Sequence, residues 1–156
     1  MSIEEAVRQR ILILDGAMGT LIQRRHLAEA DFRGGRFTNL PGEMKGNNDM
    51  LNLTQPEVIR DIHRQYLEAG ADIITTNTFS SQKISQADYH LGDYAREMAY
   101  EGARLARVCA DEYSLPERPR YVAGSVGPTN KACSMSPDVT DPAARALDYD
   151  TLRDAY

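Results

Sequence analysis

The chain has 156 residues, of which 42% are hydrophobic and 26% are charged, a composition typical of soluble globular domains. Its 18 basic and 23 acidic side chains give a net charge of −5, and because the charges are spread along the chain we expect no nucleic acid partner. No apolar run approaches the roughly 18 residues of a membrane-spanning helix, and the N-terminus lacks the apolar centre of a secretory signal, so we expect a cytoplasmic protein without a membrane partner.

The first predicted elements are a short helix and a buried strand. Residues 1–10 place their apolar side chains on one side at helical spacing. Ile11–Leu14 then forms an unbroken apolar run, which is typical of a parallel strand covered on both faces. The run ends in Asp15–Thr20, where two glycines allow a tight turn close to a ligand.

A long polar stretch separates this strand from the next helix. Residues 26–52 are rich in Gly, Asn, Asp and charged side chains. The stretch is too long for an ordinary connection, so we expect it to wrap over a functional site. Thr54, Pro56 and Glu57 then predict a capping box at the start of a helix. Apolar residues at helical spacing follow, and Gly70 is the predicted stop.

Two further strands alternate with helices. Ala71–Thr75 is the second predicted strand, a helix is predicted from about Tyr94 to Glu112, and Tyr121–Val126 is the third strand. This alternation indicates right-handed βαβ crossovers and therefore an α/β fold with a parallel sheet. Asp148–Tyr156 is predicted as an N-cap and the first turns of a helix without a stop signal, so we expect a chain that is C-terminally incomplete.

Polar side chains follow all three predicted strands. In parallel α/β folds the ligand lies at the carboxyl ends of the strands, because the loops and helix N-termini converge there. Asp15 follows the first strand, Thr76 and Asn77 follow the second, and Asn130 follows the third. Any one of them could simply serve a turn or a cap, but the three strand ends together favour a site, in which the Asp15 carboxylate could receive an ammonium group. Gly16 and the residues after it lack the ending of a P-loop and the spacing of a dinucleotide fingerprint.

The histidines and cysteines form no metal or catalytic pattern. His26, His63 and His90 have no ligand spacing, and His63 lies within a predicted helix, which favours surface or packing roles. Cys109 lies on the apolar stripe of its helix, as a small buried hydrophobe would. Cys133 lies in the loop after the third strand, on the functional side, but neither thiol has a recognisable base. Two isolated cysteines suit a reducing compartment.

Five stretches of the sequence together carry a family resemblance. They are Ile13–Thr20, Ala30–Gly34, Lys45–Asp49, Glu68–Phe79 and Gly127–Asn130. From about Arg10 onward the chain resembles the N-terminal homocysteine-binding domain of cobalamin-dependent methionine synthases. The first and fourth stretches are shared more widely among homocysteine methyltransferases that use betaine or S-methylmethionine. The second and third favour the cobalamin-dependent branch.

The resemblance implies a fold and a chemistry. The fold is a (β/α)8 TIM barrel, of which residues 1–156 would be the N-terminal portion, about three βα units of a partial homocysteine-binding domain. The family holds a zinc ion with three cysteine thiolates, and zinc favours the nucleophilic thiolate of homocysteine. That sulfur takes a methyl group from methylcobalamin, which 5-methyltetrahydrofolate recharges in the full-length enzyme, and the product is methionine.

The resemblance also assigns roles to the strand-end residues. Asp15 and Gly16 match the family's positions near the amino-acid end of homocysteine, and Thr76 lies in the matching strand-end stretch. Asn77 and Asn130 are expected to line the substrate pocket. No catalytic residue is expected in this chain.

The cysteines depart from the family's pattern. A cysteine followed much later by a Cys-Cys pair is expected, but the chain holds only Cys109 and Cys133, in contexts that do not match. We therefore expect the metal ligands beyond Tyr156, no zinc or cobalamin bound by this chain alone, and no turnover. Folate, cobalamin and reactivation modules would be its partners. Two alternatives stay open: a barrel that uses betaine or S-methylmethionine, and a small non-catalytic α/β module that binds an anion through Gly16–Thr20.

Overall fold

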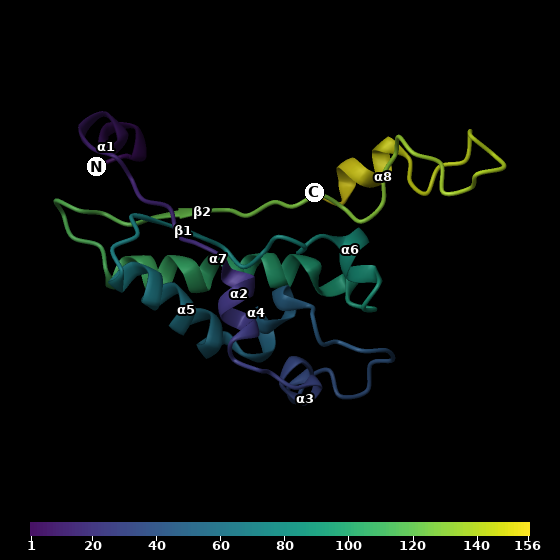
Figure 1. The fold of residues 1–156 in the computed structure, drawn as a ribbon, viewed down its shortest axis with the longest axis horizontal. Helices are drawn as coiled ribbons and strands as arrows, with labels where there is room; N and C mark the ends of the chain where they lie inside the picture. Colours follow the sequence, from purple (N-terminus) through teal and green to yellow (C-terminus); the bar gives the residue numbers. More distant parts are fainter.

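Two long helices and a short parallel sheet form the centre of the molecule (Figure 1). The structure is a computed structural model that describes all residues from 1 to 156. Helix α7 (Ala95–Glu112) packs against α5 (Pro56–Glu68) and against both strands, β1 (Ile73–Thr75) and β2 (Tyr121–Ala123), and α5 also packs against β1. The two strands are parallel, and α7 lies between them in the chain. The predicted α/β class with βαβ connection is confirmed.

The remaining elements are short helical segments. They are α1 (Ile3–Gln9), α2 (Met18–Gln23), α3 (Glu29–Arg33), η1 (Asn48–Met50), α4 (Leu51–Thr54), α6 (Lys83–Ala87), η2 (Gly92–Tyr94) and α8 (Tyr149–Asp154). In Figure 1, α1 and α8 project at opposite ends of the sheet side, whereas α3 lies on the far side of the long helices. None of the helices has the length and apolar character needed to cross a membrane.

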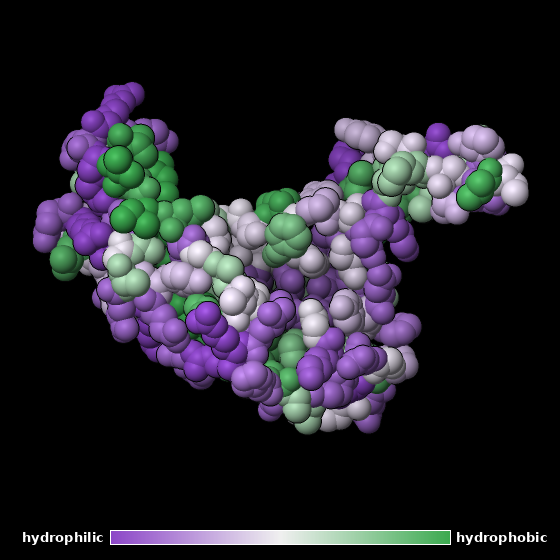
Figure 2. Space-filling view, in the orientation of Figure 1, coloured by the Kyte–Doolittle hydropathy of each residue, from purple (hydrophilic) through white to green (hydrophobic).

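The first predicted strand is reduced to a single bridge. Leu14 pairs with Ile73 in parallel, and it does so on the edge of β1 opposite β2, because Ile73 bonds to this segment while its neighbour Asp72 bonds to Tyr121. The prediction that the run is buried on both faces is wrong, since Ile11 is 89% exposed and Leu14 is 54% exposed. No second strand lies beyond this edge. Figure 2 shows the resulting hydrophobic surface gathered beside α1.

The polar stretch 26–52 contributes much of the core. Phe32, Met44 and Met50 are buried in one cluster with the inner faces of α5 and α7. A second, smaller cluster lies between α5, β1 and α7 and contains Cys109. The apolar residues are thinly spaced in this stretch, but five of them, Phe32, Phe37, Met44, Met50 and Leu51, are buried in the core. The stretch is therefore a packed covering layer with short helices of its own, and its residues 46–49 line a cavity, in agreement with the expectation that it wraps over a site.

Helix ends follow the sequence only in part. The predicted capping box at Thr54 is wrong, because α4 runs almost directly into α5 and Thr54 is already helical, with its hydroxyl donating to the Met50 carbonyl at 3.3 Å. Pro56 does occupy the first turn of α5, and Gly70, at φ +104°, follows its end as predicted. Asp148 caps α8 as predicted, since its carboxylate accepts from the Thr151 N–H.

Candidate functional site

Asp15 ties the first chain segment to the end of β1. The Thr75 N–H donates to Oδ2 at 2.9 Å, and the Thr75 hydroxyl donates to Oδ1 at 2.9 Å. Burial raises the pKa of the Asp15 carboxyl above its usual range, and the hydrogen bonds from Thr75 offset only part of that effect. Gly16 follows in close contact with α5, where an added Cβ would lie 3.1 Å from the Tyr66 hydroxyl.

Thr76 joins the continuations of β1 and β2. Its hydroxyl accepts from the Ser125 N–H at 2.9 Å and lies 2.6 Å from the hydroxyl of Thr78. The Thr78 hydroxyl in turn donates to the Ser125 carbonyl at 2.8 Å. Because that bond uses the Thr78 proton, Thr76 is the donor to Thr78, and the three residues form a closed ring of hydrogen bonds.

Asn77 connects the end of β1 to the covering layer. Its side-chain amide donates to the Asn48 carbonyl at 2.8 Å and to the Asn52 side-chain oxygen at 3.1 Å. Asn52 returns a bond to the Asn77 carbonyl at 2.8 Å. This amide pair is buried, and Gly102 of α7 packs directly on it, because an added Cβ there would lie 2.7 Å from the Asn52 amide nitrogen.

A cavity of about 620 Å³ opens beyond the carboxyl end of β1. Asn77 and Asn130 both line it, as the sequence predicted for pocket residues, and Asn130 donates to the Asp88 carboxylate at its rim. Thr76 lines a separate cavity of about 250 Å³. Asp15 and Gly16 line neither of these cavities. The predicted residues thus share one end of the sheet, but only two of the five share a cavity.

The cavity also contains polar residues that the sequence analysis did not single out. Asn47 and Gln86 exchange two side-chain hydrogen bonds, at 2.7 and 3.2 Å, and both are buried. Asp49 accepts from the Ser80 N–H at 3.0 Å and from the Ser81 hydroxyl at 2.8 Å. Burial raises the pKa of its carboxyl, and those two hydrogen bonds oppose the rise. The available signal was the placement of Asn47 and Asp49 in a stretch expected to wrap over a site.

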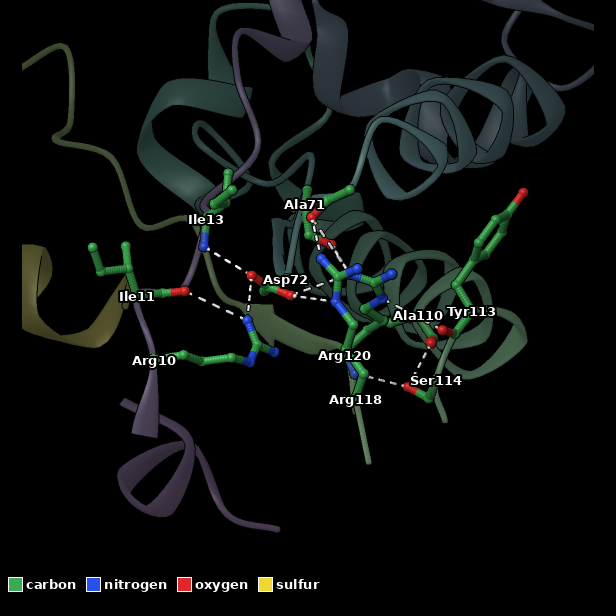
Figure 3. A network of polar contacts seen from close by, with 11 residues as sticks. Arg10, Ile11, Ile13, Ala71, Asp72, Ala110, Tyr113, Ser114, Arg118 and Arg120 are labelled. Atoms are coloured by element: carbon green, nitrogen blue, oxygen red, sulfur yellow. Dashed lines mark hydrogen bonds and ion pairs between the residues drawn. The ribbon is translucent and has the colours of Figure 1, made fainter. Parts of the chain in front are cut away.

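The amino end of β1 carries a different arrangement (Figure 3). Asp72 is 1% exposed and accepts from Arg10 at 2.7 Å, from the Ile13 N–H and Arg118 at 3.1 Å, and from Arg120 at 3.2 Å. Although burial alone would raise it, the donors led by Arg10 lower the pKa of Asp72 to about 2. Every oxygen of this carboxylate is engaged, so the cluster acts as a structural clamp.

The chain's own residues do not fit a metal ion. No three His, Cys, Asp or Glu side chains are grouped so that they could hold one. Cys109 is buried in the core and burial raises the pKa of its thiol, whereas Cys133 is half-buried and donates to the Asp148 carbonyl at 3.4 Å. His63 is buried in α5 with no partner for either ring nitrogen, which makes it a packing residue.

Comparison with known proteins gives a consistent match. The profile of a family described as homocysteine S-methyltransferase matches residues 12–156. Among solved structures the chain is similar to the homocysteine methyltransferase MmuM from Escherichia coli. The metallated form has a TM-score of 0.61 and 26% identity over 81% of this chain and 41% of that one. The oxidized form has a TM-score of 0.63 and 27% identity over 81% and 40%. This chain thus spans about two fifths of the length of those solved chains.

Proposed function

Because the chain belongs to the homocysteine S-methyltransferase family, we propose that it is part of a (β/α)8 barrel domain that binds homocysteine and methylates its sulfur to give methionine. The observation that carries the proposal is the family match over residues 12–156. The parallel strands joined through α7 and the cavity at their carboxyl end support it, since barrels of this class bind substrates at that end. In such a domain this chain would supply about three βα units, in a cytoplasmic enzyme.

The five strand-end residues are the proposed substrate-binding set. Asp15, Gly16 and Thr76 would lie beside the amino-acid end of homocysteine, and Asn77 and Asn130 would line the pocket. The support is their common position at the carboxyl end of the sheet and the cavity that Asn77 and Asn130 line. The thiols of Cys109 and Cys133 do not fit a metal site. Residues outside this chain would therefore supply the ligands of the zinc ion that favours the thiolate form of homocysteine.

The finer proposal concerns the methyl donor. We propose methylcobalamin, itself methylated by 5-methyltetrahydrofolate, with the folate, cobalamin and reactivation modules as partners. The support is the stretch Lys45–Asp49, because its sequence resembles the cobalamin-dependent branch of the family. Four of its five residues line the cavity. Betaine or S-methylmethionine is the second candidate for the methyl donor. The similarity of the chain to the homocysteine methyltransferase MmuM, whose name does not include methionine synthase, supports this alternative. Methionine formation by the gene product that contains this segment, with each donor supplied in turn, decides between them.

Binding of homocysteine to this chain tests the proposal directly. In a 1H–15N NMR titration, homocysteine is expected to shift the amide signals of Gly16, Thr76 and Asn77 while the signals of α1 stay in place. Methionine is the product analogue and alanine is the control for general amino-acid binding. If no signal moves at homocysteine concentrations of several millimolar, the proposed function fails for this chain.

A further inference from the structure

Asn52 is the one polar side chain of α4 that is buried in the interior. It is 2% exposed and lies between Leu51 and Leu53 in the chain. Its Nδ2 donates to the Asn77 carbonyl at 2.8 Å and to the Met98 carbonyl at 3.1 Å, and its Oδ1 accepts from the Asn77 side-chain amide at 3.1 Å. Asn52 lines neither of the cavities at the strand ends, so any effect that it has on a ligand is transmitted through Asn77.

The two carbonyl partners fix which way round the Asn52 amide lies. A backbone carbonyl can only accept a hydrogen bond, so the atom that faces both the Met98 and the Asn77 carbonyls must be the nitrogen. Helix α7 leaves no room for a different position, because an added Cβ on Gly102 would lie 2.7 Å from this nitrogen. Oδ1 of Asn52 is therefore held toward the Asn77 side chain.

Asn52 in turn fixes the side-chain amide of Asn77. Both protons of the Asn77 Nδ2 are used, since it donates to the Asn48 carbonyl at 2.8 Å and to Oδ1 of Asn52. Oδ1 of Asn77 accepts no hydrogen bond from the protein and is not fully enclosed, and the residue lines the cavity of about 620 Å³. The arrangement thus leaves an acceptor of Asn77, rather than a donor, for a ligand.

We propose that Asn52 is a positioning residue for substrate binding, which holds the Asn77 amide so that its oxygen is available to the ligand. The inference rests on the proposed function, because that function places homocysteine at these strand ends. With the amide turned over, Nδ2 of Asn77 would face the ligand, and its oxygen would meet the Asn48 carbonyl and Oδ1 of Asn52, which are both acceptors. A ligand group that donates a hydrogen bond is therefore bound only in the orientation that Asn52 and the Asn48 carbonyl enforce.

A double-mutant cycle on homocysteine binding tests whether Asn52 acts through Asn77. The dissociation constant of homocysteine is measured by NMR titration for the wild type, for Asn52→Ala, for Asn77→Ala and for the variant with both substitutions. Each single substitution is expected to weaken binding by about threefold to tenfold, the range for one neutral hydrogen bond. The double variant is expected to bind at most about twofold more weakly than Asn77→Ala, because Asn52 has no other route to the ligand. Thr54→Ala removes a hydrogen bond to the Met50 carbonyl within the same helical segment and is the matched control, with an expected change in affinity of less than about twofold.

Two results would overturn the inference and leave the proposed function standing. One is an unchanged affinity in Asn52→Ala, and the other is a pair of losses that multiply in the double variant, as two independent disturbances of the fold would. If the wild type does not bind homocysteine, the proposed function fails and the inference fails with it.

A measurement on the wild type alone removes any dependence on how well the variants fold. Homocysteine is expected to shift the side-chain 13Cγ signal of Asn77, whose oxygen gains a hydrogen bond, while the side-chain NH2 protons of Asn52 and Asn77 stay protected from exchange. A 13Cγ signal that does not move, or NH2 protons that lose their protection, overturns the inference.

Discussion

Two buried carboxylates near opposite ends of β1 differ in their hydrogen-bond donors and in the direction of their pKa shifts. Asp72, at the amino end, accepts from three arginines and a backbone N–H, and its pKa falls to about 2 (Figure 3). Asp49, beyond the carboxyl end, has donors on only one oxygen, and burial raises its pKa. The comparison indicates that Asp72 holds chain segments together with both of its oxygens, whereas Asp49 has one oxygen without a protein donor where it lines the cavity.

The largest expected effect comes from breaking the clamp. Asp72→Asn leaves the guanidinium of Arg120, whose side chain is only 9% exposed, without a charge partner, so the free energy of unfolding is expected to fall by about 3–5 kcal/mol. Urea denaturation measures it. Asp111→Asn removes a carboxylate from an exposed ion pair with Arg107 and is the matched control, with an expected change of at most about 1 kcal/mol. Equal effects of the two substitutions would contradict the clamp.

The pH dependence of the unfolding free energy is a second test of the packing that holds the fold together. Burial without a partner lowers the pKa of His63 to about 4, from an ordinary value of 6.5. The unfolded chain therefore binds more protons between these values, so the stability contributed is fully present above pH 6.5 and is lost as the pH falls to about 4. That loss amounts to about 3 kcal/mol. Asp72, whose pKa is also lowered, loses its contribution only below about pH 4.

The matched variant for this test is His63→Leu. Leucine does not titrate, so the difference in unfolding free energy between wild type and variant is expected to change steeply between pH 7 and pH 4.5. Subtracting the two curves removes the contributions of all the carboxylates. A difference that stays constant with pH would mean that His63 is not buried as described.

Adding a methyl group where α7 packs closely on the residues after β1 is expected to have an intermediate effect on stability. In Gly102→Ala the new Cβ would lie 2.5 Å from Thr78 Cγ2, so the helix must move away, at a cost of about 1–3 kcal/mol. At Gly35 an added Cβ meets nothing within 4 Å, and Gly35→Ala is expected to leave stability unchanged or slightly raised. Thermal unfolding of the two alanine variants compares them. If Gly102→Ala is as stable as Gly35→Ala, the close packing is refuted.

The smallest expected effect on stability is that of Asp49→Asn. Oδ1 of asparagine still accepts from Ser80 and Ser81, and removing the charge relieves the desolvation of a buried carboxylate. The free energy of unfolding is expected to change by less than about 1 kcal/mol. A loss of unfolding free energy as large as that of Asp72→Asn would mean that Asp49 has a structural role like that of Asp72, and the contrast between the two carboxylates would disappear.

Elements with a strong local pattern were predictable from the sequence. The apolar stripe gave α7 to within one residue of its start, and Pro56 and Gly70 bracketed α5, because these signals act within a turn of the helix. The first strand and the capping box at Thr54 failed, since each depends on what packs or continues beside it. The core residues of stretch 26–52 were missed because they are too thinly spaced to form a period.

The candidate site was predictable as a location and less so as a set of residues. The rule that ligands bind at strand carboxyl ends led to Asn77 and Asn130, which share the cavity. The same rule favoured Asp15, whose oxygens are both engaged by Thr75. Asp49 could not be chosen from sequence alone, because its burial and its free oxygen depend on Ser80 and Ser81, some thirty residues away.

Thermal unfolding of Asp72→Asn and Asn130→Ala, with and without homocysteine, tests most directly whether stability and substrate binding depend on different residues. At a homocysteine concentration about tenfold above the wild-type Kd, binding is expected to raise the wild-type midpoint by about 3 °C or more. Asp72→Asn is expected to melt at a lower temperature and keep that rise, whereas Asn130→Ala, which changes an exposed residue of the cavity, keeps the wild-type midpoint and loses the rise. A full rise in Asn130→Ala, or an unchanged midpoint in Asp72→Asn, would contradict the assignment of binding to the cavity and of stability to the Asp72 cluster.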